Sequence, residues 1–147
     1  MRLLICGDRN WTDDIMIRKP LEMLRVAPPP GLTIIVGRAR GADTIAETIA
    51  LEMGFAVDPY PAEWEKHGKM AGPIRNRQML VEGLAQVVWA FHDDLAQSKG
   101  TRNMVLQARL VPIPVWWYTH RFDSPKEITS VTEHHVYFRD DKQGVLF

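Results

Sequence analysis

Short apolar runs alternate with amphipathic segments along most of the chain, and this alternation constrains the fold more than any other feature of the sequence. The runs predict strands, and the segments between them show helical spacing or helix-capping residues. Strands that alternate with helices form βαβ units with right-handed crossovers around a parallel sheet. The fold class expected is therefore α/β, a three-layer Rossmann-like parallel sheet with a C-terminal β-hairpin extension. The strands expected are 3–6, 32–36, 55–57, 86–91 and 115–118, and the helices 12–25, 42–53, 74–82 and 101–110.

The 147 residues are enough for one domain with a hydrophobic core and too few for two. We expect a single domain over residues 1–147, with a core at 1–118 and an extension at 119–147. In the extension, β-branched and aromatic residues at 129–139 precede a Gly-containing turn at 140–144 and a short apolar run at 145–147. This pattern predicts a β-hairpin that packs on the body, extends the sheet edge or pairs with another subunit.

Acidic and basic residues balance at 18 each, so the chain as a whole has no field that attracts polyanions. Nucleic acid is therefore a disfavoured partner, and any affinity for phosphate has to come from a local cluster. The single cysteine, Cys6, lies in the first apolar run, which predicts a small buried side chain and fits a reducing compartment. No stretch reaches membrane-spanning length and the first residues do not form a signal peptide, so we expect a cytoplasmic protein without a membrane partner.

Residues with unusual chemistry follow the predicted strands, at the point where each strand ends. They occupy positions 7–11 after the first strand, 37–43 after the second, 63–76 after the third and 92–101 after the fourth. In parallel α/β sheets, ligands bind beyond the carboxyl ends of the strands. We therefore expect these four segments to lie on one rim of the sheet and to form a binding site there.

The stretch GRARGAD at 37–43 is the most suggestive of these segments. Gly37 and Gly41 permit tight turns that point backbone N–H groups at an anion, at the start of the helix that follows. Arg38 or Arg40 can then supply a planar partner for phosphate or carboxylate. The alternative is a simple turn with a helix N-cap at 41–43, in which both arginines are solvated.

Two further turns favour an anion. Arg75 and Asn76 stand at the start of a predicted helix, where a basic group is unfavourable against the helix dipole unless an anion lies nearby. A surface arginine tolerated at small cost is the alternative. Ser98, Gly100 and Thr101 supply small residues and hydroxyls before another helix, and an ordinary N-cap is the alternative there.

The aromatic and histidine residues of the chain predict stacking, core packing or metal binding according to where they stand. Trp11 and Trp64 stand in two of the rim segments, where a flat ring can stack on a base or sugar, or simply cover an edge of the core. The Trp116-Trp117 pair belongs to a strand, so its rings face opposite sides and core packing is expected. The His134-His135 pair also points to opposite faces and has no second pair at ligand spacing. We predict no metal and no cofactor.

These motifs, in this order, resemble the YspA/cpYpsA-related branch of the SLOG superfamily over residues 1 to about 118. The resemblance rests on Gly7-Asp8-Arg9, the stretch 37–43, Ala62-Glu63-Trp64 with Gly68-Lys69, the stretch 71–76 and the stretch 98–101. SLOG domains are Rossmann-like and include the Lonely Guy phosphoribohydrolases, the DNA-processing protein DprA, and sensors of nucleotide-derived signals in antiphage defence. The resemblance implies a nucleotide-derived ligand, and does not by itself imply chemistry. The ligand-binding residues expected are Gly7, Asp8, Arg9, Trp11, Gly37, Arg38, Arg40, Gly41, Asp43, Trp64, Arg75, Asn76, Ser98, Gly100 and Thr101.

The sequence departs from the Lonely Guy enzymes at two positions. Those enzymes have a glutamate in a PGGxGTxxE loop, and aligning Gly100-Thr101 on its GT puts Met104 where the glutamate would stand. Their arginine–lysine pair on the preceding helix is matched by Arg75, but Asn76 replaces the lysine. The usual catalytic carboxylate is therefore missing.

Cleavage of an N-glycosidic bond passes through an oxocarbenium-like state that a carboxylate stabilises, so another acid would have to substitute. The rim offers Asp8, Asp43 and Glu63. Glu63 is the best placed of the three because it adjoins Trp64, and it is the tentative catalytic residue. A solvated surface glutamate is the alternative.

Three functions follow as expectations. The first is a module that binds a nucleotide or nucleotide-derived signalling molecule, sequestering or sensing it in phage or antiphage defence. The second is a nucleotide N-glycoside hydrolase, similar to a phosphoribohydrolase, that uses Glu63. The third is a DNA-processing protein, which would need an extended basic track that the balanced charge does not provide. We also expect a homo-oligomer, a dimer or higher.

Overall fold

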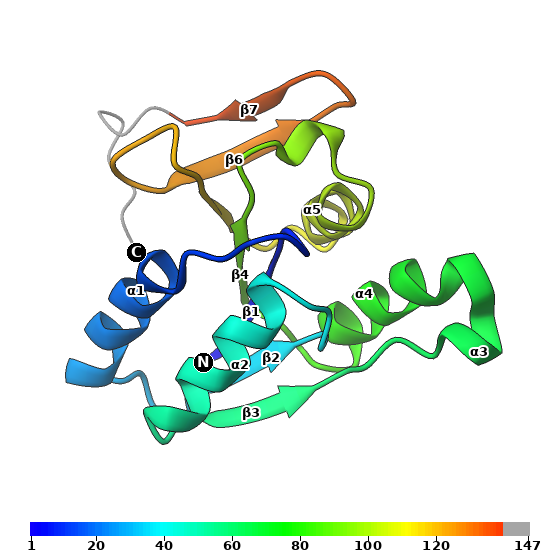
Figure 1. Cartoon of the computed structure of the whole chain (residues 1–147). Coiled ribbons are helices and arrows are strands. Elements are labelled where there is room, and N and C mark those ends of the chain that lie inside the picture. The colour runs from blue at the N-terminus through cyan, green and yellow to red at the C-terminus, as the bar shows by residue number, and fades with distance from the viewer. Residues whose placement is uncertain (140–147) are drawn as a thin grey trace.

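A computed structural model describes residues 1–139, which form an α/β fold around a seven-stranded sheet (Figure 1). The strands are β1 Arg2–Gly7, β2 Thr33–Val36, β3 Ala56–Pro59, β4 Val87–Phe91, β5 Val115–Tyr118, β6 Lys126–Val131 and β7 Val136–Phe138. The helices are α1 Asp14–Val26, α2 Ala42–Glu52, α3 Trp64–His67, α4 Ala71–Val81 and α5 Gly100–Leu110, with short 3-10 helices η1 Gly68–Met70 and η2 Leu95–Gln97. No helix in this part of the chain is both long and apolar enough to cross a membrane.

The sheet has the strand order β3-β2-β1-β4-β5-β6-β7. The five strands β3, β2, β1, β4 and β5 run parallel, and β6 and β7 add to the β5 edge as antiparallel strands. Gly7 at the end of β1 lies opposite Phe91 at the end of β4, and Val36 in β2 lies opposite Pro59 in β3. Neighbouring strands therefore finish at the same level, and the loops that follow them leave the sheet at one rim.

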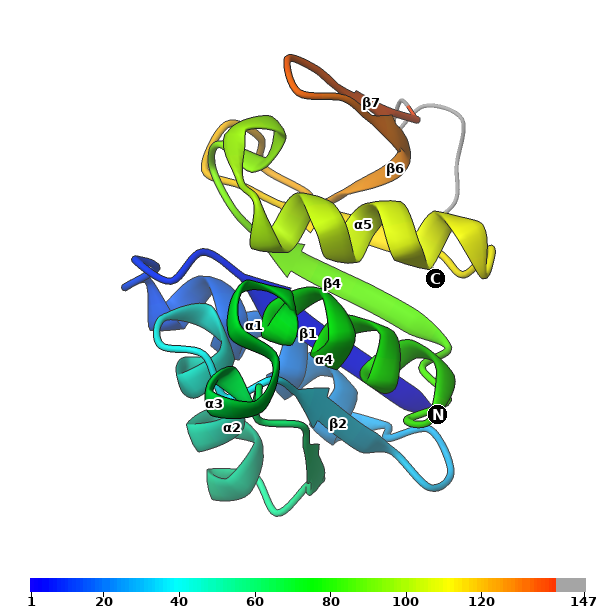
Figure 2. The same ribbon diagram turned by 90° about the vertical axis from the view of Figure 1, so that its right-hand side faces the viewer.

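Helices cover both faces of the sheet because successive strand residues point to opposite sides. Leu3 and Ile5 of β1 face α1 and α2 and share a core with Ile17. Leu4 of β1 faces α4 and α5 and shares the second core with Met104. Figure 2 shows α4 and α5 in front of the sheet, and Figure 1 shows α1 and α2 on the other side. The predicted three-layer Rossmann-like fold is confirmed.

Tryptophan and cysteine side chains follow the same alternation. Trp116 packs in the core beneath α1 and α2, and Trp117 packs in the core beneath α4 and α5. Cys6 is buried in the second core, and this burial raises the pKa of its thiol. The expectations of core packing for these three residues are confirmed.

Local capping residues set the start of α1 and the end of α2. α1 begins after Asp13, whose carboxylate accepts a hydrogen bond from the N–H of Met16 at 3.2 Å. This cap matches the sequence signal of an acidic residue before the first amphipathic stretch. After α2, Gly54 has a φ of +78°, a left-handed conformation that glycine adopts without strain.

The segment between β3 and α4 is more ordered than the sequence indicates. It contains the helical turns α3 and η1 in place of the long loop expected at 59–72. α4 begins at Ala71, earlier than the predicted residue 74, and includes Pro73 in its first turn. Proline suits this position because the first N–H groups of a helix have no partner within the helix.

The C-terminal extension forms a hairpin, as expected, but its turn lies earlier in the chain than predicted. β6 pairs with β7, Val131 lies opposite Val136, and the N–H of Thr132 donates to the carbonyl of His135 at 2.8 Å. The prediction of one strand over 129–139 is therefore wrong, because the chain reverses at 132–135. The predicted turn at 140–144 and strand at 145–147 lie outside the described residues.

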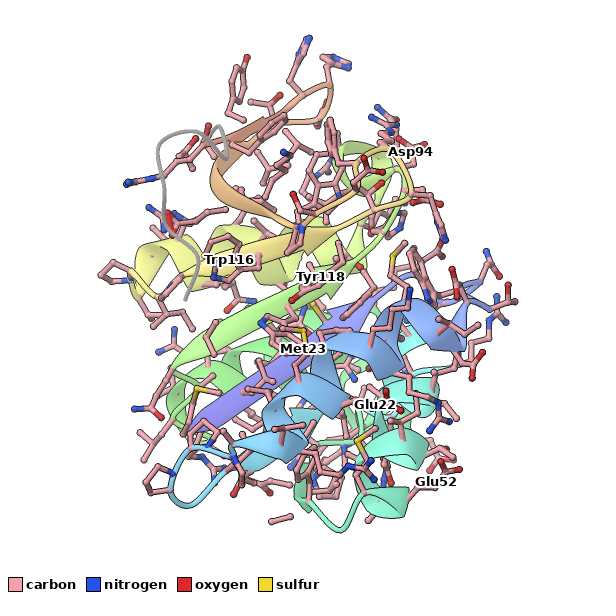
Figure 3. The ribbon with its side chains drawn as sticks, turned by 90° about the vertical axis from the view of Figure 1, so that its left-hand side faces the viewer. Glu22, Met23, Glu52, Asp94, Trp116 and Tyr118 are labelled. Carbon is pink, nitrogen blue, oxygen red and sulfur yellow. The ribbon has the colours of Figure 1, made fainter. Side chains whose placement is uncertain are left out.

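An apolar groove of about 890 Å³ lies beside α1, on the sheet face that α1 and α2 share. Trp116 and Tyr118 of β5 line it from the sheet, and Met23 lines it from α1 (Figure 3). Nothing in the sequence pattern indicates this groove, because its apolar residues read as ordinary core positions of their strands and helix.

Candidate functional site

Three loops and one helix meet at a pocket of about 370 Å³ on the carboxyl-end rim of the sheet. The loop after β1 contributes Arg9, the loop after β2 contributes residues 37–40, and the segment after β3 contributes Pro61, Ala62 and Trp64. Arg75 reaches the pocket from α4. The pocket lined by these nine residues is called the arginine pocket below.

The four arginines of the pocket differ in how their charges are compensated. Arg38 forks onto the carboxylate of Glu47, with N–O distances of 3.2–3.4 Å, and has a left-handed φ of +56°. Arg9 lies over the ring of Trp64, with the guanidinium carbon 5.5 Å from the ring centroid. Neither Arg9 nor Arg40 forms an ion pair with any of residues 1–139. Two guanidinium groups are therefore open to an anion.

Arg75 lies at the base of the pocket and is buried. Its Nη1 donates to the carbonyl of Gly37 at 2.5 Å, and its Nε donates to Oδ1 of Asn76 at 3.1 Å. A side chain at position 37 would overlap this guanidinium, so the first glycine of GRARGAD makes room for Arg75. Burial lowers the pKa of Arg75, and the nearby Asp43 carboxylate opposes that shift.

Asp43 lies beneath the loop after β2 and does not line the pocket. Its side chain accepts a hydrogen bond from the N–H of Ala39 at 3.2 Å, and the residue is only 5% exposed. Burial raises the pKa of Asp43 to about 6, against the lowering effects of Arg75 and of hydrogen bonds from the loop backbone. Asp43 thus stabilises the backbone conformation of this loop.

Glycines let the loops after β1 and β2 approach closely. A Cβ at Gly7 would overlap the carbonyl of Phe91, and a Cβ at Gly41 would overlap the carbonyl of Asp8. The N–H of Ala42 donates to that same Asp8 carbonyl at 3.1 Å. Gly7, Asp8 and Gly41 therefore lie behind the pocket, where they fix the position of its two arginine-bearing loops.

The N-terminus of α5 forms a separate part of the rim. The N–H of Thr101 donates to Oγ of Ser98 at 3.0 Å, and the Asn76 amide donates to the carbonyl of Gly100 at 3.3 Å and to Oδ1 of Asn103 at 3.1 Å. Ser98, Gly100, Thr101 and Asn76 do not line the arginine pocket. The predicted third turn thus lies on the same rim, and the Asn76 hydrogen bonds attach it to α4.

Trp64 and Trp11 differ in solvent exposure, although the sequence predicted that both present a ring to a ligand. Trp64 is 49% exposed on the pocket wall. Trp11 is buried, its ring edge meets Phe91 at a centroid distance of 5.8 Å, and its face stacks on His120 at 4.8 Å. Only Trp64 has a face that a ligand in this pocket can reach.

Glu63 and Met104, the two positions that bear on catalysis, lie outside the pocket lining. The Glu63 side chain is exposed and lies 3.8 Å from Nζ of Lys66, and Glu63 does not line the pocket. Met104, at the position of the Lonely Guy glutamate, is buried in the core beneath α4 and α5. No carboxylate belongs to the nine residues that line the pocket.

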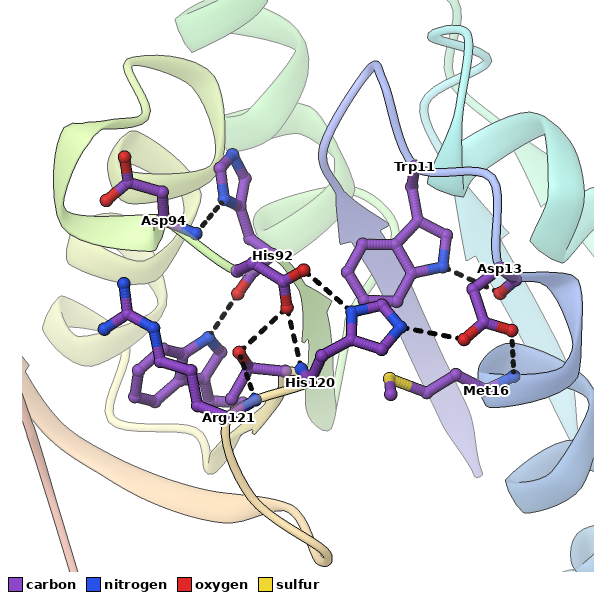
Figure 4. Close-up of polar contacts among 10 residues, drawn as sticks. Trp11, Asp13, Met16, His92, Asp94, His120 and Arg121 are labelled. Atoms are coloured by element: carbon purple, nitrogen blue, oxygen red, sulfur yellow. Dashed lines mark hydrogen bonds and ion pairs between the residues drawn. The ribbon is translucent and has the colours of Figure 1, made fainter.

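Sequence reasoning missed a polar cluster on the same rim, centred on His120 (Figure 4). The His120 ring lies between the carboxylates of Asp13 and Asp93, with N–O distances of 2.8 and 2.7 Å. His92 lies nearby, where its Nδ1 accepts from the N–H of Asp94 at 2.9 Å, and burial lowers the pKa of His92. The sequence feature that could have indicated this cluster is the position of His120 directly after the fifth strand, at the carboxyl end of the sheet.

The parallel sheet, its two helical layers and the pocket at the strand carboxyl ends define a Rossmann-like α/β protein. The chain belongs to the YspA, cpYpsA-related SLOG family, whose model matches residues 1–67. This match is shorter than the span of 1 to about 118 over which the motifs resemble the family. The chain is also 42% identical to the Gene 61 protein of Mycobacterium phage D29, over 119 residues that cover 78% of this chain and 93% of the phage protein.

Two solved structures of DNA processing protein A share the fold. The Streptococcus pneumoniae protein matches with a TM-score of 0.62 and 18% identity, over 79% of this chain and 49% of that chain. The Helicobacter pylori protein, whose structure concerns its single-stranded DNA binding mode, matches with a TM-score of 0.61 and 20% identity, over 85% of this chain and 68% of that chain. This chain thus spans about half the length of the S. pneumoniae protein, and at such identities the likeness concerns the fold.

Proposed function

We propose that this protein binds a nucleotide or nucleotide-derived signalling molecule in the arginine pocket. The observation that carries the proposal is the charge of the lining: four arginines and no carboxylate, with Arg9 and Arg40 forming no ion pair among the described residues. Guanidinium groups that form no ion pair and are gathered in a concave site favour a phosphate-bearing ligand, which they can bind through paired N–H donors.

The shape of the pocket supports a ligand with a flat group beside its phosphates. Trp64 presents half of its surface on the wall, and the guanidinium of Arg9 now covers one face of its ring. A base or a planar sugar substituent can stack on such a ring, while Arg9 turns toward the phosphate. Stacking and charge pairing together describe a nucleotide better than they describe inorganic phosphate.

Binding without cleavage has more support than hydrolysis. An N-glycoside hydrolase needs a carboxylate next to the ribose, and Glu63 lies outside the pocket lining while Met104 is enclosed in the core. We therefore propose that the ligand is sequestered or sensed unchanged. The similarity to a phage protein supports a role in phage or antiphage defence.

A DNA-processing role has less support than nucleotide binding. The likeness to DNA processing protein A concerns the fold, and a shared fold does not transfer a function. The chain has equal numbers of acidic and basic residues, and the four arginines of the pocket form a local basic cluster, whereas DNA binding favours an extended basic track.

A thermal-shift screen with mono-, di- and cyclic nucleotides tests the proposal, with single-stranded DNA as a further ligand. We expect at least one nucleotide to raise the melting temperature, because a ligand at about 100 times its dissociation constant stabilises the folded state by about 2.7 kcal/mol. Mass spectrometry of the incubated mixture is expected to return the nucleotide intact. No shift with any nucleotide, or a shift with DNA alone, would contradict nucleotide binding, and released base would make the protein a hydrolase.

A further inference from the structure

The His120 ring joins three loops of the rim. Its Nδ1 lies 2.7 Å from Oδ2 of Asp93, in the loop after β4, and its Nε2 lies 2.8 Å from Oδ2 of Asp13, in the loop after β1 (Figure 4). His120 itself follows β5. An ionised carboxylate can only accept hydrogen bonds, so both ring nitrogens have to donate. This arrangement requires the imidazolium form of His120.

Further contacts hold both carboxylates in place. Asp93 Oδ1 accepts from the backbone N–H of His120 at 2.7 Å and from the hydroxyl of Thr119 at 2.9 Å. Asp13 caps α1 through Oδ1, which accepts from the N–H of Met16. Each carboxylate therefore offers the His120 ring its second oxygen, while the first oxygen binds the start of α1 for Asp13 and residues 119–120 after β5 for Asp93.

The same ring supports Trp11. The two rings stack at a centroid distance of 4.8 Å with an interplanar angle of 20°, and the Trp11 indole N–H donates to the backbone carbonyl of Asp13 at 2.8 Å. The N–H of Trp11 donates to the carbonyl of Asp8 at 3.1 Å. Residues 8–13 are thus held at one end by the sheet and at the other by His120.

Arg9 projects from this short loop into the arginine pocket. We propose that His120 is a positioning residue for the pocket: as an imidazolium it fixes Asp13 and Trp11, and through them the loop that presents Arg9 to an anion. This inference rests on the proposed function for its effect on affinity. The contacts of the His120 ring with Asp13, Asp93 and Trp11 are called the joint below. The joint is present in the protein without ligand and can therefore be measured separately.

The charged groups that face the His120 ring give the expected pH dependence. They are Asp13 from the loop after β1 and Asp93 from the loop after β4, and their hydrogen bonds raise the pKa of His120 above its ordinary 6.5. Burial acts to raise the pKa of Asp93, but its hydrogen bonds with His120 and Thr119 outweigh this effect and the net pKa is lowered. The hydrogen bond with His120 is the largest cause that lowers the pKa of Asp13, so both carboxylates stay ionised down to below pH 3.8. The joint is therefore complete between about pH 4 and 6.5 and loses one donor as pH rises through the raised pKa of His120.

Nuclear magnetic resonance titration tests the joint directly. We expect the His120 ring to titrate above pH 6.5, and we expect the Trp11 indole N–H and the Arg9 amide to shift with the same midpoint. In a His120→Gln variant these two resonances are expected to show no such midpoint. A His120 ring that titrates at or below 6.5, or Trp11 and Arg9 resonances that ignore its titration, would overturn the positioning role.

Calorimetric binding of inorganic sulfate, whose charge is constant over this pH range, tests the effect on the pocket. Parent protein is expected to bind sulfate more tightly at pH 6 than at pH 9, on the order of fivefold, because the lost hydrogen bond loosens the loop that carries Arg9 and does not itself contact the anion. His120→Gln should bind weakly at both pH values, and His120→Arg, which keeps the charge and several donors, should bind tightly at both. Equal affinity in parent and His120→Gln would overturn the inference, whereas no sulfate binding in any protein would contradict the anion site itself.

Discussion

Asp43 and Arg75 are opposite charges that share a buried position beneath the loop after β2. The Asp43 carboxylate accepts a hydrogen bond from the N–H of Ala39, and the Arg75 guanidinium donates one to the carbonyl of Gly37. The two side chains thereby fix the backbone of GRARGAD. The sequence predicted that both contact a ligand directly. That assignment stays a prediction, and their burial gives them a second role as supports of the loop.

The raised pKa of Asp43 predicts a specific pH dependence of stability. Its pKa is about 6 in the folded protein and ordinarily 3.8, so the native state binds more protons between these values. The contribution of Asp43 to the free energy of unfolding therefore falls as pH rises from about 4 to about 6, by up to about 1.4 kcal/mol per pH unit.

Asp43→Asn should remove this slope, because asparagine keeps the acceptor for Ala39 and does not ionise. Urea unfolding of parent and variant at half-unit pH steps measures the difference between their profiles. Asp94→Asn, a change at an exposed aspartate of the loop after β4, is the matched control and should parallel the parent. Parallel profiles for parent and Asp43→Asn would contradict the buried carboxylate.

At the scale of elements, the loop after β1 and the loop after β2 act as one packed unit. Gly41 has a φ of +77°, and a Cβ there would overlap Asp8 and Arg9 backbone atoms. Gly54 has nearly the same φ, +78°, but a Cβ there would meet open space. Gly41 therefore differs from Gly54 by its close packing against the loop after β1.

Gly41→Ala is expected to destabilise the protein by about 1–3 kcal/mol more than Gly54→Ala, because only the first change forces two loops apart. Both variants place an alanine at a positive φ, and Gly41, with a ψ of −126°, also lies outside the left-handed helical region that alanine reaches at a cost of about 1–2 kcal/mol. Free energies of unfolding in urea at pH 7 give the comparison. Equal losses in the two variants would show that the two loops are not packed as described.

The strands and helices were predictable because each has a clear period or cap, as in the burial of alternate β1 residues on two faces. α3 was missed because its four residues, Trp64–His67, are too few to show a helical period. The hairpin turn was placed too late because residues 132–135 contain no glycine, proline or asparagine, whereas 140–144 contain two aspartates and a glycine.

The site was predictable as a set of loops and less so as a set of contacts. Topology alone brings Arg9, Arg40 and Trp64 to one rim, since each follows a parallel strand. Sequence cannot say which side of a loop faces the pocket, and Trp11 turns inward because its ring packs between Phe91 and His120. His120 was overlooked because its partners, Asp13 and Asp93, are distant in sequence and meet it only in the fold.

At the scale of the whole molecule, the groove beside α1 is the face through which we expect two copies to associate into the predicted homo-oligomer. Met23 is 76% exposed on its α1 wall. Lys19 lies on the same wall and Asp123 on the opposite one, so that in a two-fold contact each copy can pair its Lys19 with Asp123 of the other.

Met23→Lys should convert the oligomer into a monomer in light scattering, with little change in the folding of each chain, because the side chain is exposed. Leu110→Lys is the matched control, since Leu110 is 84% exposed on α5, which covers the other face of the sheet. A monomeric parent protein, or a Met23→Lys variant with the mass of the parent oligomer, would contradict this interface.

The most direct test of the arginine pocket is the dissociation constant of the nucleotide that stabilises the parent most, measured by titration calorimetry in three proteins. Arg40→Ala removes an open guanidinium from the pocket and should weaken binding about tenfold or more, as expected for one lost charge-assisted hydrogen bond worth about 1.5–3 kcal/mol. Arg77→Ala, an exposed arginine of α4 outside the pocket, should bind as the parent does. Equal affinity in Arg40→Ala and the parent, or equal losses in Arg40→Ala and Arg77→Ala, would contradict a nucleotide site at this pocket.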